Sequence, residues 1–358
     1  SLDGPIGSIG RHLPGFERDV DDYTLGLGAS WEIDLFGGLR RQREAARASA
    51  VASQADAAAV KVAVEADAAD AYLQVRAFQA RIAVARRQQQ VQQDLVALLT
   101  KRLREGVSPE RDLRQAEAAQ AGVDASIPPL TVALEAELNR LDVLMGAQPG
   151  TYRAELTQEA AIPTPPAFAE TATPSDLLRH RPDVVAAEAR LRAANARIGA
   201  AVSEYYPHVS LAALLGVDSL SSSTLFDGDA RQSQVAVGLR WRLFDFGRID
   251  AEVAAAKGRD AEALAAYRLS VLKAAEEVEN AFTSLNQQRI LAAALERQIA
   301  ALSIARRQAE DAYEGGVISL VEVRDADRDL LTASDQLVQT RAGAARAAVL
   351  TVRALGGG

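Results

Sequence analysis

A repeat with a constant offset of 210 residues constrains the fold of this chain more than any other feature of its sequence. The clearest match lies between Trp31-Glu32-Ile33-Asp34-Leu35-Phe36-Gly37 and Trp241-Arg242-Leu243-Phe244-Asp245-Phe246-Gly247. Shorter matches follow in the same register: Ala71-Tyr72 with Ala281-Phe282, Gly106-Val107 with Gly316-Val317, Leu113-Arg114 with Val323-Arg324, and Gly146 with Gly356. Because these matches need no gap, they indicate two copies of one structural unit.

Each copy contains a run that predicts a very long helix. No proline or glycine lies between Gly38 and about Glu105, and Gly258 is the only one between Arg248 and Glu314. About 65 helical residues would extend roughly 100 Å, whereas the average helix of a globular protein has about 11–12 residues. Helices of this length need partners along their whole flank, as in a coiled coil.

A glycine-containing turn ends each long helix, and a shorter helix is expected to return from it. Gly106 and Gly316 permit the left-handed conformation that often stops a helix. Ser108 or Ser319 is a candidate N-cap for the helix that follows, with Pro109 in the first turn. We expect the return helices to end near Met145 and Leu355, a further helix to run from Asp176 to about Tyr205, and the proline-rich residues 146–174 to be irregular.

Alternating apolar and polar residues predict three strands: Tyr23–Asp34, His208–Val217 and a third segment around Val235–Leu243. The turn-rich residues 218–229 make the last two a hairpin. On this pattern alone, amphipathic strands of a soluble sandwich remain an alternative. So few strands form no soluble core and close no barrel, so several chains should combine them in a membrane barrel. The residues expected to face lipid are Leu25, Leu27, Trp31, Val235, Val237, Leu239 and Trp241.

The composition excludes other classes. A hydrophobic content of 48% is too high for a disordered chain, and a net charge of −8 argues against nucleic acid as a partner. The absence of cysteine excludes disulfides and thiolate metal sites. No run of about 18 apolar residues predicts a membrane-spanning helix, and no signal peptide is present, so an exported protein would be mature or truncated here.

No residue pattern indicates catalysis. The three histidines, His12, His180 and His208, are far apart and lack the spacing of metal ligands. No P-loop is present, so we expect neither a cofactor nor enzymatic activity. The basic run Arg179–Arg181 is interpreted as stabilising a helix start.

The residues above resemble those of the TolC-like outer-membrane efflux proteins, particularly the OprM-like lipoprotein branch that serves resistance-nodulation-division pumps. The matching stretches are Trp31–Gly37, Gly106-Val107 through Asp112–Ala116, Leu177 to Asp183 with Ala186–Glu188, Leu243–Gly247 and Ala354–Gly358. The resemblance covers nearly the whole chain. It implies a mainly α-helical homotrimer with a long antiparallel coiled-coil tunnel and a trimer-closed barrel of twelve strands, four from each native chain. It also implies an N-terminal segment, with a first strand and a lipid-modified cysteine, that is missing from this sequence.

The expected organisation assigns each segment to the outer membrane or to the periplasm. The segments are a first-repeat β-hairpin remnant in the membrane (1–37), a periplasmic helical hairpin (38–145), an irregular equatorial segment (146–174), a helix leading to the barrel (175–206), a second β-hairpin in the membrane (207–247) and a second periplasmic helical hairpin (248–358).

The expected function is that of a passive exit channel in a tripartite efflux system that exports small molecules across the periplasm and the outer membrane of a Gram-negative cell. Its partners would be a periplasmic adaptor protein and an inner-membrane pump, of the resistance-nodulation-division type, which supplies the energy. Two alternatives remain open: an exit duct for secreted polypeptides, and a structural coiled-coil protein without a pore.

Two sets of site residues follow at the helical-turn end. Asp112 and Glu322 occupy equivalent positions after the two turns, and Asp325 lies one helical turn later, so three chains would form rings of carboxylates. The resemblance implies that Asp112, Tyr313, Glu322 and Asp325 constrict a periplasmic gate, with Arg324 or Arg111 as a latch because Ile318 replaces an arginine found in some members. A solvated helix face is the alternative for each acid. The expected adaptor-docking tips are Gly106, Val107, Ser108, Gly316, Val317, Ile318 and Ser319.

Overall fold

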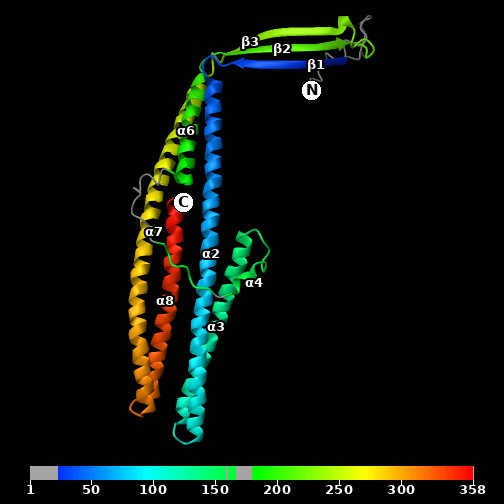
Figure 1. Cartoon of the computed structure of the whole chain (residues 1–358). Helices are drawn as coiled ribbons and strands as arrows, with labels where there is room; N and C mark the ends of the chain where they lie inside the picture. The colour runs from blue at the N-terminus through cyan, green and yellow to red at the C-terminus, as the bar shows by residue number, and fades with distance from the viewer. Residues whose placement is uncertain (1–22, 159, 167–179, 358) are drawn as a thin grey trace, which may run out of the picture. The chain divides into compact units, whose positions relative to one another are not determined.

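The computed structural model describes residues 23–158, 160–166 and 180–357 (Figure 1). Its main helices are α2 (Gly38–Arg104), α3 (Glu110–Leu144), α7 (Arg248–Glu314) and α8 (Leu320–Ala354). Both α2 and α7 have 67 residues, and both α3 and α8 have 35. The bounds of each pair differ by the offset read from the sequence, so the predicted repeat is confirmed in the helices.

Left-handed glycines follow the helices at matching positions. The φ angle is 73° at Gly106 after α2 and 72° at Gly316 after α7. It is also positive at Gly146 after α3 and at Gly356 after α8. A side chain at these positions would strain the backbone, so glycine explains why each helix stops where it does.

The return helix α3 contains Pro128 and Pro129, which the sequence analysis did not consider. A proline inside a helix lacks the N–H that bonds to the carbonyl four residues earlier. The carbonyls that lose a partner are those of Asp124 and Ala125; Ala125 is exposed and Asp124 is partly exposed, so water can reach them. None of the helices in the described ranges combines the length and the apolar character that a membrane crossing requires.

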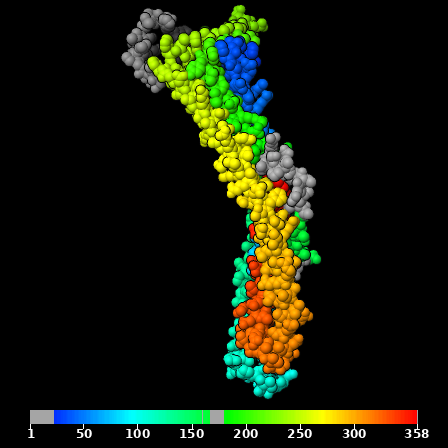
Figure 2. Space-filling view, turned by 90° about the vertical axis from the view of Figure 1, so that its left-hand side faces the viewer, coloured from blue at the N-terminus to red at the C-terminus, as the bar shows by residue number. Residues whose placement is uncertain are grey.

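The chain divides into two compact units. The larger unit comprises residues 50–190 and 264–358, and in it α8 lies beside both α2 and α7. Ion pairs join α8 to α2 at Arg81–Asp335 (2.7 Å), and α8 to α7 at Arg341–Glu296 (2.8 Å). Figure 2 shows α7, yellow to orange, alongside the red-orange α8. Alanines supply most of the buried α8 surface, which permits the close approach of neighbouring helices.

The smaller unit comprises residues up to Ser49 and Leu191–Ala263, and it contains a three-stranded antiparallel sheet. The strands are β1 (Tyr23–Ile33), β2 (His208–Ser219) and β3 (Arg231–Arg240), in the order β1-β2-β3. The predicted hairpin of β2 and β3 is confirmed, with the short η2 (Gly228–Ala230) just before β3. β1 belongs to the first repeat and pairs with β2, across the repeat boundary.

The described residues between α3 and β2 contain two more helices, α4 (Arg153–Leu156) and α6 (Pro182–Ser203). The expected start of a helix near Asp176 lies outside the described residues. Arg181, just before α6, does bind at the helix start through Asp183 (2.7 Å), as predicted. It reaches further than predicted, because it also donates to the carbonyl of Ala354 (2.9 Å) and pairs with Glu277 (2.7 Å).

The irregular segment after α3 is held by buried polar side chains of the long helices. Asp142, which is 1% exposed, accepts hydrogen bonds from the N–H groups of Gly150 (2.6 Å) and Tyr152 (3.1 Å). On α2, the Gln79 amide donates to the carbonyl of Leu156 (2.7 Å), and Arg76 donates to that of Gln158 (2.5 Å). Residues 146–158 of this segment are therefore held against the long helices, although α4 is their only helix.

Candidate functional site

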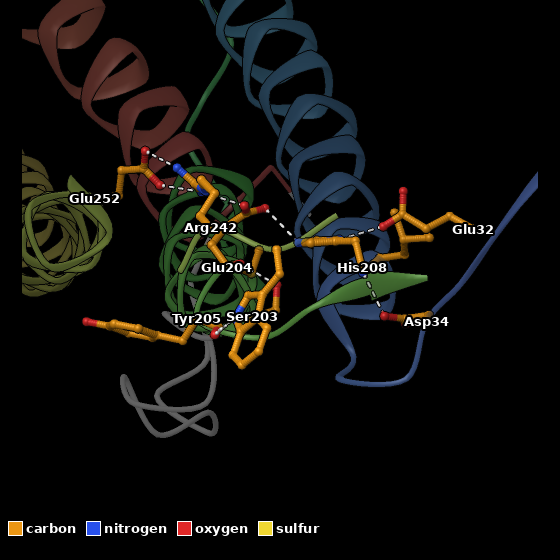
Figure 3. A network of polar contacts seen from close by, with 11 residues as sticks. Glu32, Asp34, Ser203, Glu204, Tyr205, His208, Arg242 and Glu252 are labelled. Atoms are coloured by element: carbon orange, nitrogen blue, oxygen red, sulfur yellow. Dashed lines mark hydrogen bonds and ion pairs between the residues drawn. The ribbon is translucent and has the colours of Figure 1, made fainter. Parts of the chain in front are cut away.

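Glu32 and Arg242, which occupy equivalent positions in the two repeats, contact side chains at the junction between α6 and β2 in the smaller unit (Figure 3). Nδ1 of His208 lies 2.7 Å from the Glu32 carboxylate, and its Nε2 lies 3.6 Å from that of Glu204. Arg242 forms an ion pair with Glu204 and a second one, of 3.1 Å, with Glu252. Because Glu32 and Arg242 occupy equivalent repeat positions, the two copies bind the same junction with opposite charges.

The ion pair between Arg242 and Glu252 shifts the pKa of both side chains. The hydrogen bonds that Arg242 makes with Glu252 and Glu204 raise the pKa of its guanidinium. The same hydrogen bond lowers the pKa of the Glu252 carboxyl. Nearby, the phenol of Tyr205 donates to Asp250, and this bond raises the pKa of the phenol. The sequence does not predict this network, although the Glu32/Arg242 charge reversal between the two copies of the Trp-to-Gly motif is visible in it.

An aspartate caps the start of each long helix. Asp34 accepts hydrogen bonds from the N–H groups of Leu39 (3.1 Å) and Arg40 (2.8 Å) before α2. Asp245 accepts from the N–H of Ile249 (2.6 Å) before α7. Partial burial opposes charge on Asp34, but the N–H groups of Arg40 and Leu39 outweigh it and lower the pKa of this carboxyl. The capping explains why both repeats carry Asp shortly before a left-handed glycine.

The strand register puts the residues expected to face lipid on one face of the sheet. Trp31 lies opposite Leu211, which lies opposite Val237, and directly opposed residues of antiparallel strands share a face. Leu27 and Val235 on this face are 85% and 73% exposed. The other residues of the expected set on this face are Leu25 and Leu239. The opposite face carries Gly26, Gly28, Glu32, Gln234 and Arg240, among others.

Trp241, which is also expected to face lipid, directly follows β3, and its side chain is 48% exposed. β3 ends at Arg240, and the indole N–H of Trp241 donates to the carbonyl of Tyr205 (3.0 Å). The alternation in the sequence continues past the end of the strand. There Trp241 is held by a side-chain hydrogen bond to the helix junction and not by a partner strand.

The two expected docking tips have nearly the same backbone. The N–H of Val107 bonds to the carbonyl of Arg102 (2.9 Å), and that of Val317 bonds to the carbonyl of Ala312 (2.9 Å). Both valine side chains are exposed, at 63% and 79%. Ser108 and Ile318 follow them, and each is partly buried.

The helix starts after the tips differ. Ser319 is the N-cap of α8, and both its N–H and its hydroxyl donate to the Glu322 carboxylate (3.3 Å each). The expectation that Ser108 caps α3 is wrong, because α3 begins at Glu110 with Pro109 at the N-cap. Glu322 therefore has a structural partner that Asp112, its repeat equivalent, lacks; Asp112 contacts only the adjacent Arg111 (3.4 Å) in the described chain.

The remaining gate candidates are not gathered into one cluster in the described part of a single chain. Asp325 pairs with Arg328 (3.4 Å), one turn along α8. Arg324 donates across to Gln115 of α3 (3.2 Å). The Tyr313 ring lies under the Arg102 guanidinium, 5.2 Å from the ring centroid. Tyr313 also packs on a buried apolar cluster made of Leu99, Leu113, Ala116 and Leu320, which joins the two tips.

An ion pair between a partly exposed arginine and a buried aspartate lies close to the second tip and was not predicted. Arg306 of α7 lies 2.8 Å from Asp327 of α8 and 3.0 Å from Glu310. Burial disfavours the charge of Arg306, but its hydrogen bond to Asp327 outweighs this and raises the pKa of the guanidinium. The pair borders a cavity of about 180 Å³ that Leu95, Leu98 and Tyr313 also line. Arg306 and Asp327 lie nearly equally far from Gly316 in the sequence, so pairing residues across the turn would have found them.

The model of the family described as outer membrane efflux protein matches residues 4–147 and 173–358. The pyoverdine export outer membrane protein OpmQ of Pseudomonas putida is 32% identical over 352 residues, covering 96% of this chain and 72% of OpmQ. The cation efflux system protein CusC of Escherichia coli K12 is 28% identical, covering 98% of this chain and 77% of CusC.

Solved structures of such channels have the same fold. The outer-membrane channel OprN superimposes with a TM-score of 0.87 at 34% identity, covering 97% of this chain and 78% of OprN. A CusC structure superimposes with a TM-score of 0.85 at 26% identity, covering 97% of this chain and 80% of CusC. The long helices and the small antiparallel sheet described above are therefore shared with these channels.

Proposed function

The chain belongs to the outer membrane efflux protein family, and on this premise we propose that three copies close a twelve-stranded barrel above an α-helical periplasmic tunnel. As a member of this family it is a non-enzymatic outer-membrane channel of a tripartite efflux system that exports small molecules. The structural coiled-coil alternative is thereby excluded. The relatives named above, for pyoverdine export and for cation efflux, favour small cargo over polypeptides.

The observation that supports the proposed membrane barrel is the exposed apolar face of the three-stranded sheet. Leu27 on β1 and Val237 on β3 are 85% and 75% exposed, so this face is not covered by any other described element. The outer edges of β1 and β3 have no partner strand among the described residues. Open edges are not tolerated in lipid, so further strands, including strands of other copies, must pair with them, and the apolar face then contacts the bilayer.

The assignment of segments follows from this proposal. The strands, within residues 1–37 and 207–247, lie in the outer membrane. The hairpins of residues 38–145 and 248–358 lie in the periplasm, joined by the equatorial residues 146–174, and residues 175–206 lead back to the barrel. The tips point to a periplasmic adaptor, and an inner-membrane pump of the resistance-nodulation-division type provides the energy.

Reconstitution into planar bilayers tests the channel. Purified protein should yield discrete conductance steps, and Leu27→Asp/Val237→Asp should abolish insertion because two charges would lie in lipid. Ser30→Asp is the matched control, since Ser30 lies on the opposite, polar face of the same sheet. Unchanged insertion of the double variant would reject the assignment of the apolar face.

The gate proposal assigns Asp112, Tyr313, Glu322, Arg324 and Asp325 to the periplasmic constriction. Because Glu322 also caps α8, its charge must be removed without removing the cap, and glutamine serves in this position. We expect Asp325→Ala/Glu322→Gln to raise the single-channel conductance, whereas Asp329→Ala, which removes a neighbouring exposed acid, should leave it unchanged. Equal conductance of all three proteins would reject the carboxylate gate.

The docking proposal assigns the turns Gly106-Val107-Ser108 and Gly316-Val317-Ile318-Ser319 to the adaptor. Val107→Asp/Val317→Asp should impair adaptor-dependent export in cells while the trimer remains intact. Val60→Asp, at a comparably exposed valine within α2, is the control. Normal export by the double variant would refute the docking role.

A further inference from the structure

His208, the first residue of β2, lies between the side chains of two glutamates (Figure 3). Its Nδ1 is 2.7 Å from the carboxylate of Glu32 on β1, and its Nε2 is 3.6 Å from the carboxylate of Glu204, just after α6. An ionised carboxylate only accepts hydrogen bonds, so Nδ1 carries the proton that Glu32 accepts. In the neutral imidazole Nε2 is then an acceptor as well, and it faces a second acceptor, Glu204.

The Nε2 atom of His208 has no hydrogen-bond partner among the described residues, and it is shielded from solvent. Its distance of 3.6 Å from Glu204 exceeds that of a hydrogen bond, which is about 2.7–3.2 Å. A buried polar atom without a partner costs free energy, and water does not reach this one. A proton on Nε2 would remove this cost, because the ring would donate to Glu204 and place a positive charge between two negative ones.

Two arginines near the end of β3 oppose a positive charge on the ring. Arg240 lies directly opposite His208 in the sheet and lines the same cavity of about 480 Å³. Its side chain is exposed, so water and salt screen its repulsion. Arg242 lines the cavity too, but it is already neutralised by ion pairs with Glu204 and Glu252.

The other side of the ring, towards β1 and α2, is negative or neutral. Asp34 borders a second, smaller cavity together with His208, and it is already paired with Arg40 (3.3 Å). Gln42 of α2 lines both cavities and carries no charge. Both ionic contacts of the ring itself are therefore with carboxylates, and these favour its charged form.

We propose that His208 is a proton-operated latch that ties β1, β2 and the end of α6 together when its ring is charged. Histidine is the side chain whose charge ordinarily changes between about pH 5 and about pH 8. A proton taken up from solvent at Nε2 closes the contact to one oxygen of Glu204, while Arg242 holds the other oxygen and also binds Glu252 of α7. Loss of the proton reopens the contact. The latch therefore links the strand and helix ends more tightly in mild acid than at neutral pH.

Trp241 reports on this contact, because its indole N–H donates to the carbonyl of Tyr205, the residue after Glu204 (3.0 Å). The chain has two tryptophans, so Trp31→Phe leaves Trp241 as the only one. In the full chain with this substitution, in detergent, the emission maximum of Trp241 should shift in one step between about pH 8 and about pH 5. Adding His208→Gln should abolish the shift, because an amide still donates a hydrogen bond but takes up no proton.

Two further substitutions in the Trp31→Phe protein identify the source of the shift. His180→Gln is the matched control, since it removes an exposed histidine of the larger unit, and it should leave the shift unchanged. Glu204→Gln should remove most of the shift, because its side chain keeps an acceptor but loses the charge that attracts the protonated ring. An equal shift in the His208→Gln protein, or no shift in the Trp31→Phe protein itself, would overturn the latch.

Thermal unfolding tests the direction of the effect. As the pH falls from about 8 to about 5, the unfolding temperature of the parent should rise relative to that of His208→Gln, because only the parent gains the contact to Glu204. A relative fall would show that repulsion from Arg240 and Arg242 outweighs the two carboxylates, and it would overturn the proposal.

Under the proposed function the latch lies where the membrane barrel meets the periplasmic tunnel, but all of its members belong to one chain. The outcomes therefore separate the two proposals. A failed titration of Trp241 in a protein that still conducts would overturn the latch and leave the channel standing. A normal titration in a protein that does not conduct would reject the channel and leave the latch.

Discussion

The two helical hairpins share their helix bounds but not the way in which their residues are covered. In α8 twelve residues are buried, and in α3 only five are, although the two helices have the same length. The second hairpin carries the buried Arg306–Asp327 pair, whose first-repeat equivalents are Val96 and Glu117. The first hairpin ends instead on Asp142, which holds the irregular segment. The two hairpins therefore share their backbone conformation, but their side chains determine how much of each hairpin is buried within a single chain.

The largest expected effect comes from removing the basic partner of the buried pair. Arg306→Ala leaves Asp327, whose side chain is 4% exposed, without its cation. Breaking a buried pair in this way costs about 3–5 kcal/mol of unfolding free energy. Guanidinium titration in detergent, followed by circular dichroism, measures this loss. The double variant Arg306→Val/Asp327→Leu should recover most of it, and a single variant as stable as the parent would show that the pair is not what distinguishes the second hairpin.

A reciprocal exchange between the hairpin ends should have the next largest effect. Asp142→Val introduces the residue of the equivalent position, Val352, and leaves the N–H groups of Gly150 and Tyr152 without an acceptor. The expected loss is about 1–3 kcal/mol, because two hydrogen bonds are lost and each contributes about 0.5–1.5 kcal/mol. Val352→Asp, at an exposed position, should change stability by less than about 0.5 kcal/mol. The same denaturant titration measures both, and equal effects would remove the distinction between the two ends.

A smaller effect is expected at the start of α8. Glu322→Ala should cost about 1 kcal/mol because the Ser319 N–H and hydroxyl lose their acceptor, whereas Glu322→Gln should cost much less. Asp112→Ala, at the equivalent position of α3, lacks such a cap to lose. Thermal unfolding of the three variants ranks them. If Asp112→Ala proved the most destabilising variant, the inference that only α8 is capped by its acidic residue would be rejected.

The sequence predicted the elements well because long-range periodicity controls them. The absence of glycine and proline indicated the bounds of α2, and strict alternation located β1. Local rules failed where tertiary contacts decide the outcome. Trp241 continues an alternating pattern but binds the carbonyl of Tyr205, and Pro109 takes the cap position expected for Ser108.

The candidate sites were less predictable than the fold. The gate acids were chosen from their position after the turns, but the sequence does not show that Glu322 is a cap or that Asp325 faces Arg328. The Arg306–Asp327 pair and the His208–Glu204–Arg242 network join residues that come together only when helices and strands have packed. The sequence offers one signal for each. Arg306 and Asp327 lie at nearly equal distances on either side of the turn, and Arg242 of the network is the repeat equivalent of Glu32.

The smallest expected effect is a pH dependence of the free energy of unfolding. It arises at Arg181, which binds Asp183, Glu277 and the carbonyl of Ala354 at the end of the second hairpin. Burial opposes the charge of Asp183, but its ion pair with Arg181 and the N–H of Val184 outweigh it and lower the pKa of this carboxyl. A carboxyl with a lowered pKa in the folded state stabilises the fold above its unfolded pKa, near 3.9, and loses this contribution as the pH falls through the folded value. Between about pH 7 and about pH 3 the parent should therefore lose more stability than Asp183→Asn. Because the Asp183 side chain is 45% exposed, the difference should stay within about 1 kcal/mol. Denaturant titrations at the two pH values measure it. Equal losses would mean that Arg181 binds α8 through the carbonyl of Ala354 and α7 through Glu277 without help from Asp183.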